Sequence, residues 1–71
     1  MANLTELKTC MEESGIPTAE IARRSGILRE TLYNRLSGKS EFKASEIASL
    51  TTTLRLTKAQ RDKIFFANEG E

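Results

Sequence analysis

The stretch TAEIARRSGILRETLYNRLSGK, from Thr18 to Lys39, decides the fold that the sequence predicts. It contains the pattern of two short helices joined by a turn centred on Gly26. Ala22 precedes this glycine by four residues, and Leu32 follows it by six. We expect Gly26 to adopt a positive φ, which glycine does without a steric clash, and the small Ala22 to let the helices approach closely. The spacing predicts a helix-turn-helix with Ala22, Gly26 and Leu32 as its scaffold.

The chain before and within this stretch predicts two helices. Leu4, Leu7 and Met11 have helical spacing, and Gly15 is suited to end the first helix. Thr18 is expected to cap the second helix through its hydroxyl. The residues expected to fill the wedge between the second and third helices are Ile21, Ile27, Leu32 and Leu36.

The chain after Gly26 predicts three more helices. The inner faces of the third and fourth are expected to hold Leu28, Leu32 and Leu36, then Ala44, Ile47, Ala48, Thr51 and Leu54. Thr57 and Gln60 have the spacing of a capping box for a fifth helix through about Ala67. Because no segment alternates like a half-buried strand, we expect an all-α fold. It would form one domain of five helices over residues 1–71.

The length and composition of the chain exclude several classes of function. The 71 residues suffice for one domain, and no apolar run approaches the roughly 20 residues of a membrane span. The N-terminus lacks the pattern of a signal peptide, so we expect a cytoplasmic protein without a membrane partner. Cys10 is the only cysteine and histidine is absent, which excludes a Cys/His zinc site. We expect no enzymatic activity, no metal or other cofactor and no small-molecule ligand.

The charge is unevenly distributed along the chain. Residues 18–43 hold six basic side chains against three acidic ones, a net charge of +3. Residues 1–17 carry −2, and residues 44–71 are balanced. A positive segment that coincides with the helix-turn-helix pattern is typical of a DNA-facing surface.

Four segments together carry a resemblance: EIARRSGI, ETLYNRLSGKSEF, SEIASL and LTKAQRDKIFF. They resemble the Cro/repressor-type (XRE) helix-turn-helix family, especially the small Cro-like regulators of phages and prophages of Gram-positive bacteria. The resemblance covers about residues 4–67. It implies a lambda-repressor-like DNA-binding domain whose third helix enters the major groove. Two residues depart from the family pattern: Leu28 and Lys43 stand where hydroxyl residues are usual at the starts of the third and fourth helices.

The third helix carries the candidate base contacts. On a helical wheel with Leu32 pointing inward, the residues that point outward are Glu30, Tyr33, Asn34 and Ser37. Arg29 lies on the flank at the N-terminal end. Arg29 suits guanine, Asn34 suits adenine, and Glu30 can accept from a cytosine amino group. The resemblance places base contacts at these positions and their neighbours, with Leu28 near a thymine methyl. The expected base contacts are Leu28, Arg29, Glu30, Tyr33 and Asn34.

The edges of the motif carry the candidate phosphate contacts. The free N–H groups at the start of the second helix favour an anion near Thr18. The resemblance places the loop after the third helix against the DNA backbone. The expected phosphate contacts are Thr18, Ser37, Lys39, Ser40 and Lys43.

The C-terminal aromatic pair bears on dimerisation. Phe65 and Phe66 differ by about 100° around a helix, so one is expected inward and the other exposed, with burial of both rings as the alternative. The possible dimer contacts are Leu54, Leu56, Phe65 and Phe66. We therefore expect a transcriptional regulator, a repressor that occupies an operator in double-stranded DNA as a homodimer. The alternative is a protein-interaction adaptor, antirepressor or antitoxin-like, that keeps the same fold.

Overall fold

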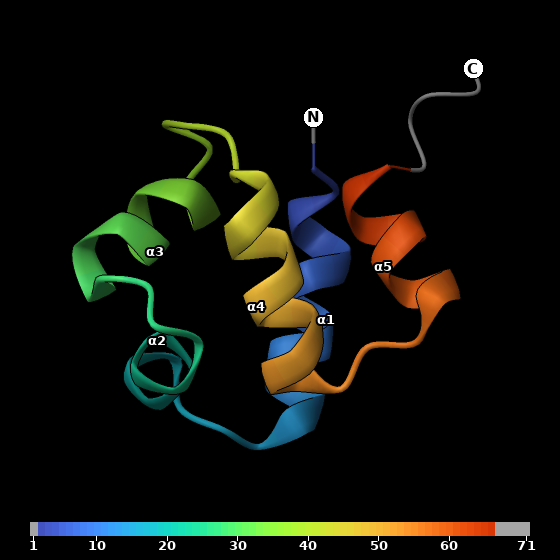
Figure 1. Cartoon of the computed structure of the whole chain (residues 1–71), viewed down its shortest axis with the longest axis horizontal. Helices are drawn as coiled ribbons and strands as arrows, with labels where there is room; N and C mark the ends of the chain where they lie inside the picture. The colour runs from blue at the N-terminus through green and yellow to red at the C-terminus, as the bar shows by residue number, and fades with distance from the viewer. Residues whose placement is uncertain (1, 67–71) are drawn as a thin grey trace.

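The computed structural model describes residues 2–66, and these form five helices and no strand (Figure 1). The helices are α1 Leu4–Ser14, α2 Thr18–Ser25, α3 Arg29–Leu36, α4 Ala44–Leu54 and α5 Lys58–Phe65. The predicted all-α class and the number of helices are confirmed for this part of the chain. Helix α5 ends at Phe65, and Ala67, the predicted end of the fifth helix, lies outside the described residues.

Local chemistry sets most of the helix ends. The side chain of Asn3 accepts a hydrogen bond from the N–H of Glu6 at 3.1 Å and caps α1. Helix α1 ends at Gly15, whose φ of +73° lies in the left-handed region. Thr57 and Gln60 form the predicted capping box of α5, with hydrogen bonds of 2.9 and 3.0 Å. These ends follow from short sequence signals.

Helix α2 starts differently from the prediction, and α4 starts without a hydroxyl cap, as expected. Thr18 is the first residue of α2 and not its cap, because Pro17, with its φ at −59°, takes the cap position without a side-chain bond. Lys43 takes the cap position of α4. Its backbone N–H donates to Oε1 of Glu46 at 2.9 Å, but a lysine side chain has no acceptor with which to return the bond.

The core draws one fully buried aliphatic side chain from each helix. Helix α4 packs against both α1 and α2, while α3 packs on α2 and α5 on α1 (Figure 1). Burying an aliphatic side chain contributes about 1.5–3 kcal/mol, so no helix is dispensable to this core. The five side chains are Leu7, Ile21, Leu32, Leu50 and Ile64.

The inner face of α4 is rotated from its predicted position. Ala44 and Ala48 are exposed, whereas Leu50 is fully buried. Ile47 and Leu54 pack partly buried against the core as expected. The larger aliphatic side chains set the face, because they remove more apolar area from water than alanine does.

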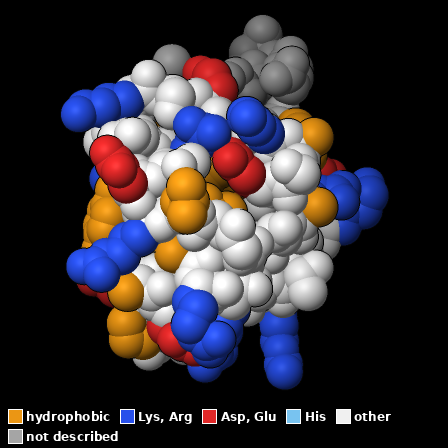
Figure 2. Space-filling view, turned by 60° about the vertical axis from the view of Figure 1, so that its left-hand side comes forward, with side chains coloured by type: hydrophobic (Ala, Val, Ile, Leu, Met, Phe, Trp, Pro, Cys, Tyr) orange, Lys and Arg blue, Asp and Glu red, His pale blue; other side chains and the backbone are white. Residues whose placement is uncertain are grey.

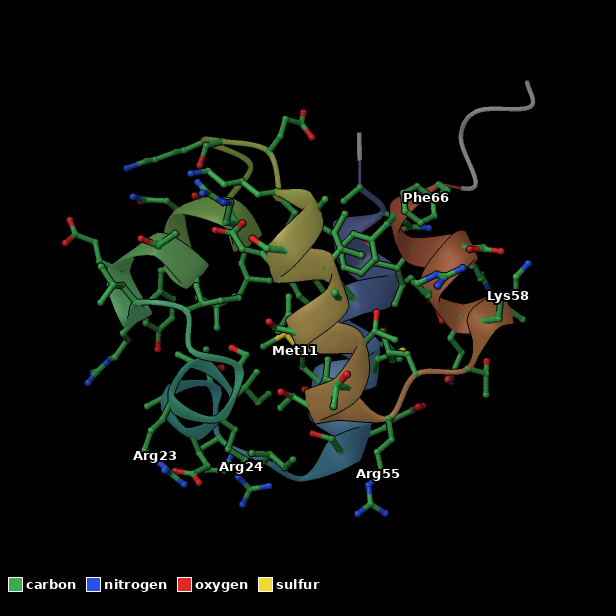
Figure 3. The ribbon with its side chains drawn as sticks, in the orientation of Figure 1. Met11, Arg23, Arg24, Arg55, Lys58 and Phe66 are labelled. Carbon is green, nitrogen blue, oxygen red and sulfur yellow. The ribbon has the colours of Figure 1, made fainter. Side chains whose placement is uncertain are left out.

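The two adjacent phenylalanines point in different directions, as predicted. Phe65 is buried, and its ring packs edge-on against Phe42 with centroids 5.4 Å apart. Phe66 remains 43% exposed (Figure 3). Phe65 therefore leaves the set of possible dimer contacts, because its ring is enclosed by its own chain. Leu54 and Leu56 are partly buried against the core.

Candidate nucleic-acid interface

The turn between α2 and α3 has the geometry that the spacing predicts. Gly26 has a φ of +75°, and the N–H of Ile27 donates to the carbonyl of Ala22 at 3.1 Å. Ala22 and Ile27 are both buried. A Cβ at Gly26 would meet nothing within 4 Å, so glycine is required by the backbone angle and not by space. The turn sends the chain back so that α3 crosses α2.

Helix α3 has one anchored side and one open side. Leu32 and Leu36 are buried in the core. Asn34 lies two residues from each of them, about 200° around the helix, and so faces the opposite direction. Arg29 and Glu30, in the first turn, are exposed. Helix α3 lies at the edge of the molecule (Figure 1), so these polar side chains are on an outer face.

Leu28 is not part of the inner face, contrary to the prediction from its spacing. It is 76% exposed and occupies the cap position of α3 with a ψ of 139°. Because this residue lies outside the helix, the four-residue period that links Leu32 and Leu36 does not extend to it. Its side chain forms no cap bond, so the first N–H groups of α3 have no side-chain cap. The absence of a hydroxyl at this position is thus not compensated locally.

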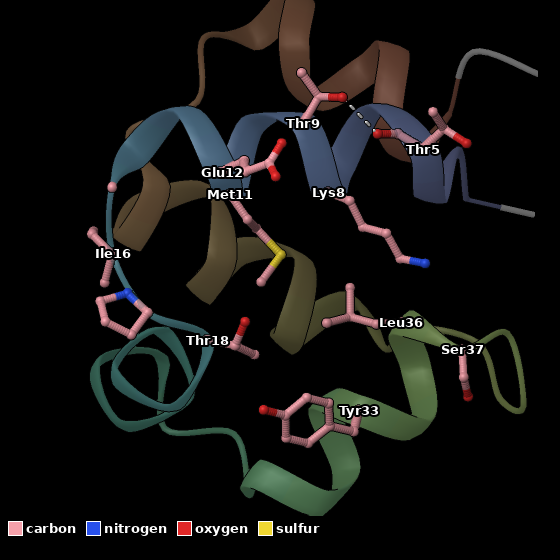
Figure 4. Close-up of a pocket in the computed structure, with 12 residues that line it drawn as sticks. Thr5, Lys8, Thr9, Met11, Glu12, Ile16, Thr18, Tyr33, Leu36 and Ser37 are labelled. Carbon is pink, nitrogen blue, oxygen red and sulfur yellow. Dashed lines mark hydrogen bonds between the residues drawn. The ribbon is translucent and has the colours of Figure 1, made fainter.

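Tyr33 faces a groove between α1, the start of α2 and α3 (Figure 4). The groove has a volume of about 790 Å³, and its apolar lining residues include Met11, Ile16 and Leu36. Thr18 lines it as well, so the structure brings Thr18 and Tyr33 together, which the sequence did not predict. Tyr33 is 48% exposed, but its direction differs from that of Asn34 by about 100°. The five candidate base contacts therefore do not share one direction.

Both basic side chains of α2 form ion pairs with an acidic neighbour. The carboxylate of Glu20 accepts hydrogen bonds from Arg23 and, at 2.8 Å, from Nε of Arg24. The bonds from Arg23, followed by those from Arg24, lower the pKa of Glu20 to about 2. The three side chains remain partly or largely exposed, and both arginines project from the molecule (Figure 3).

A second ionic contact joins α3 to α4. Arg35 donates from Nε and Nη2 to the two carboxylate oxygens of Glu46, at 2.8 and 3.0 Å, and from Nη1 to the hydroxyl of Ser40. The side chains of Arg35 and Glu46 are only 12% and 13% exposed. Hydrogen bonds from Arg35, and then from the backbone of Lys43, lower the pKa of Glu46 despite its partial desolvation. The sequence pattern did not predict this contact, although it contains two signals: a basic residue at the end of one helix and an acidic residue at the start of the next.

The positive charge of residues 18–43 is consequently less concentrated than the sequence indicated. Within residues 2–66, Arg29, Lys39 and Lys43 form no ion pair, and neither do Glu30 and Glu41. Figure 2 brings the left-hand side of Figure 1 forward. On this face the basic side chains lie in separate groups, with acidic side chains among them. The free cations lie at the start of α3 and in the loop that follows it.

The loop between α3 and α4 gathers four of the five candidate phosphate contacts: Ser37, Lys39, Ser40 and Lys43. All four are exposed. The backbone carbonyl of Asn34 holds the start of the loop. It accepts hydrogen bonds from the backbone N–H of Lys39 and from the hydroxyl of Ser37, each at 3.0 Å. Thr18, the fifth candidate, lies across the groove from this loop.

The arrangement offers hydrogen-bond donors and charge. Within residues 2–66 no group of three or more potential ligand side chains could hold a metal ion. Over the same residues, no helix combines the length and the apolar character needed to cross a membrane. Comparison of the chain with protein-family models, with curated proteins and with solved structures gives no match.

Proposed function

We propose that this chain is a sequence-specific DNA-binding transcriptional regulator of the Cro/repressor (XRE) helix-turn-helix type. Its five helices would have the lambda-repressor-like arrangement, with α3 as the helix that enters the major groove. The observation that carries the proposal is the two-sided environment of α3. Leu32 and Leu36 anchor one side in the core, while on the other side Glu30 is exposed and Asn34 is partly exposed. A helix presented in this way fits the major groove, which is about 12 Å wide.

The first turn of α3 is the part that reads bases in this proposal. Arg29 pairs with guanine O6 and N7, and Glu30 accepts from the amino group of cytosine. Asn34, one turn further on, pairs with adenine N6 and N7. Leu28, exposed at the cap position, contacts a thymine methyl. Recognition helices place their N-terminal residues at the base edges, and Arg29 and Glu30 lie in the first turn of α3.

Binding would regulate transcription by occupancy. Lys39 and Lys43 attract the DNA backbone, and two copies of the chain occupy half-sites about one helical turn apart. Phe66, exposed directly after α5, is the leading contact between the copies, and Leu54 and Leu56, partly buried against the core, are further candidates. A bound dimer excludes polymerase without any reaction on the DNA. Such small regulators act in the cytoplasm and are typical of phages and prophages.

A protein-interaction adaptor is the second candidate, and one observation favours it. Leu28 is 76% exposed next to Glu30, which forms no ion pair within residues 2–66. An apolar side chain beside an acidic one suits a protein surface better than a phosphate backbone. Binding to DNA should weaken steeply between about 50 and 200 mM salt, whereas an adaptor would bind duplexes weakly or without sequence preference.

Selection of bound duplexes from random DNA tests the proposal. We expect enriched sites with two-fold symmetry. On such a site Arg29→Ala should cost roughly 1–3 kcal/mol and relax the preference at one base pair. The matched control is Lys58→Ala, which also removes one positive charge but lies on α5, where Lys58 is paired with Asp62 at 3.6 Å (Figure 3). Failure to enrich any sequence, or equal losses for both variants, would count against the proposal.

A further inference from the structure

Arg35 is largely engaged within the protein. Its Nε and Nη2 atoms are occupied by the carboxylate of Glu46 at 2.8 and 3.0 Å, and its side chain is 12% exposed. The remaining Nη1 group donates to the hydroxyl oxygen of Ser40. Arg35 is thus largely enclosed by the protein, and one of its donor groups is directed to the loop between α3 and α4.

Glu46 fixes the orientation of Arg35. The arginine lies in the last turn of α3 and the glutamate in the first turn of α4, where each charge interacts favourably with its own helix dipole. A bidentate pair between planar groups also restricts rotation of the guanidinium. Glu46 accepts a further bond from the N–H of Lys43 at 2.9 Å, so the same carboxylate holds the far end of the loop. The direction of the Nη1 group is therefore set by the tertiary structure.

The hydroxyl of Ser40 is left with a free hydrogen. A guanidinium has only donors, so Ser40 Oγ must act as the acceptor in this bond. No oxygen within residues 2–66 accepts the hydroxyl hydrogen of Ser40, and the residue is exposed. Donation by a cation to Oγ polarises the hydroxyl and makes it a better donor. Lys39 and Lys43 lie on either side in the sequence, so the hydrogen emerges in a positively charged loop.

Ser37, in the same loop, has the opposite arrangement. It is exposed as well, but its hydroxyl donates to the carbonyl of Asn34 at 3.0 Å. Its hydrogen is committed within the protein and cannot reach a phosphate unless that bond breaks. The two serines therefore have different donor capacity although their sequence environments are similar.

We propose that Arg35 is a positioning residue for DNA binding: it holds the hydroxyl of Ser40 so that this hydroxyl donates to a phosphate oxygen of the DNA backbone. The role rests on the proposed function, since the acceptor is DNA. It assigns Ser40, and not Ser37, as the neutral phosphate contact of the loop, and it makes that contact dependent on an arginine that is largely enclosed by its own chain.

The test is a set of binding isotherms on a labelled duplex of the sequence that the wild-type chain selects. We expect Ser40→Ala to bind about tenfold more weakly, because it loses a hydrogen bond to a charged group, and Ser37→Ala to bind within about twofold of wild type. The dependence of log K on log salt should keep its slope in Ser40→Ala, since no charge is lost. Lys39→Ala should instead flatten that slope by about one.

The positioning role is tested by Arg35→Lys, which keeps the charge but not the bidentate pair or the third donor. We expect it to lose about as much affinity as Ser40→Ala, and the double variant to lose little more than either alone. Additive losses would overturn the role of Arg35, and wild-type affinity of Ser40→Ala would overturn the whole inference. If circular dichroism shows that Arg35→Lys is unfolded, the comparison of the two serine variants decides. Absence of binding by the wild-type chain itself would instead refute the proposed function, and this inference with it.

Discussion

The molecule contains two ionic arrangements that use the same chemistry in different surroundings. On α2, Glu20 binds Arg23 and Arg24 within one turn, and the arginine side chains are 72% and 50% exposed. Between α3 and α4, Arg35 and Glu46 are eleven residues apart in sequence and are 12% and 13% exposed. The first arrangement forms wherever α2 forms. The second exists only when two helices are packed together.

The difference shows that formal charge is a poor measure of what a side chain can do. The exposed cluster stays accessible to water and salt, so it contributes little to stability but still adjusts the local field. The enclosed pair excludes most water, so loss of either partner strands a charge. Arg35 was counted in the +3 of residues 18–43, yet it faces Glu46 and not the solvent.

The largest expected effect comes from breaking the enclosed pair. Glu46→Ala leaves the guanidinium of Arg35 without its carboxylate. We expect the free energy of unfolding to fall by about 2 kcal/mol, which is less than for a fully buried pair because some water reaches this one. Urea denaturation of wild type and variant measures it. Glu41→Ala is the matched control: Glu41 is exposed and without an ion pair within residues 2–66, and its loss should change stability by less than about 0.5 kcal/mol. Equal losses would show that the two glutamates are equivalent.

The second-largest expected effect is a difference in acid sensitivity between the two ionic arrangements. The folded-state pKa of Glu46 is lowered by Arg35, so its stabilisation is fully present above the unfolded value of about 4.3 and is lost as pH falls through the lower folded value. The pKa of Glu20 is lowered too, to about 2, but 1 M salt screens that exposed cluster. In 1 M NaCl, therefore, Glu46→Gln should be less acid-sensitive than wild type between pH 6 and 3, while Glu20→Gln should follow wild type. Denaturation midpoints across this range test it, and the reverse order would contradict the comparison.

The smallest expected effect is on DNA binding at α2. Glu20→Gln removes the acidic partner of Arg23 and Arg24, and the proposed function then predicts a roughly two- to fivefold gain in affinity for a non-specific duplex at low salt. The midpoint of thermal unfolding should hardly change. Fluorescence anisotropy with a duplex that lacks the selected site measures the gain. If affinity does not change, the two arginines lie outside the reach of the DNA.

Local signals predicted most of the fold. Gly15 and Gly26 end helices with positive φ, and Thr57 with Gln60 begins one, because these residues act through their own backbone and near neighbours. The same holds for the opposite directions of Phe65 and Phe66, which follow from helix geometry. The scaffold of the helix-turn-helix was predicted for this reason.

Packing decided the features that the sequence misplaced. The spacing of Leu28, Leu32 and Leu36 placed Leu28 on the inner face, whereas it takes the cap position that the family resemblance implied and is exposed. The alanines and leucines of α4 allow more than one inner face, and the choice of Leu50 depends on where α1 and α2 lie. In the candidate site, Tyr33 faces the groove of which α1 forms the opposite wall.

By itself the sequence determined five helices, their order and a turn at Gly26, because hydrogen bonds and steric limits between close neighbours suffice for these. Only the tertiary structure decided which cations remain free, since pairing of Arg35 with Glu46 requires two helices to meet. It likewise decided that Ser40 keeps its hydroxyl hydrogen while Ser37 does not. Charge and hydrogen-bonding capacity are shared between distant residues, and a linear pattern does not reveal which of them come into contact.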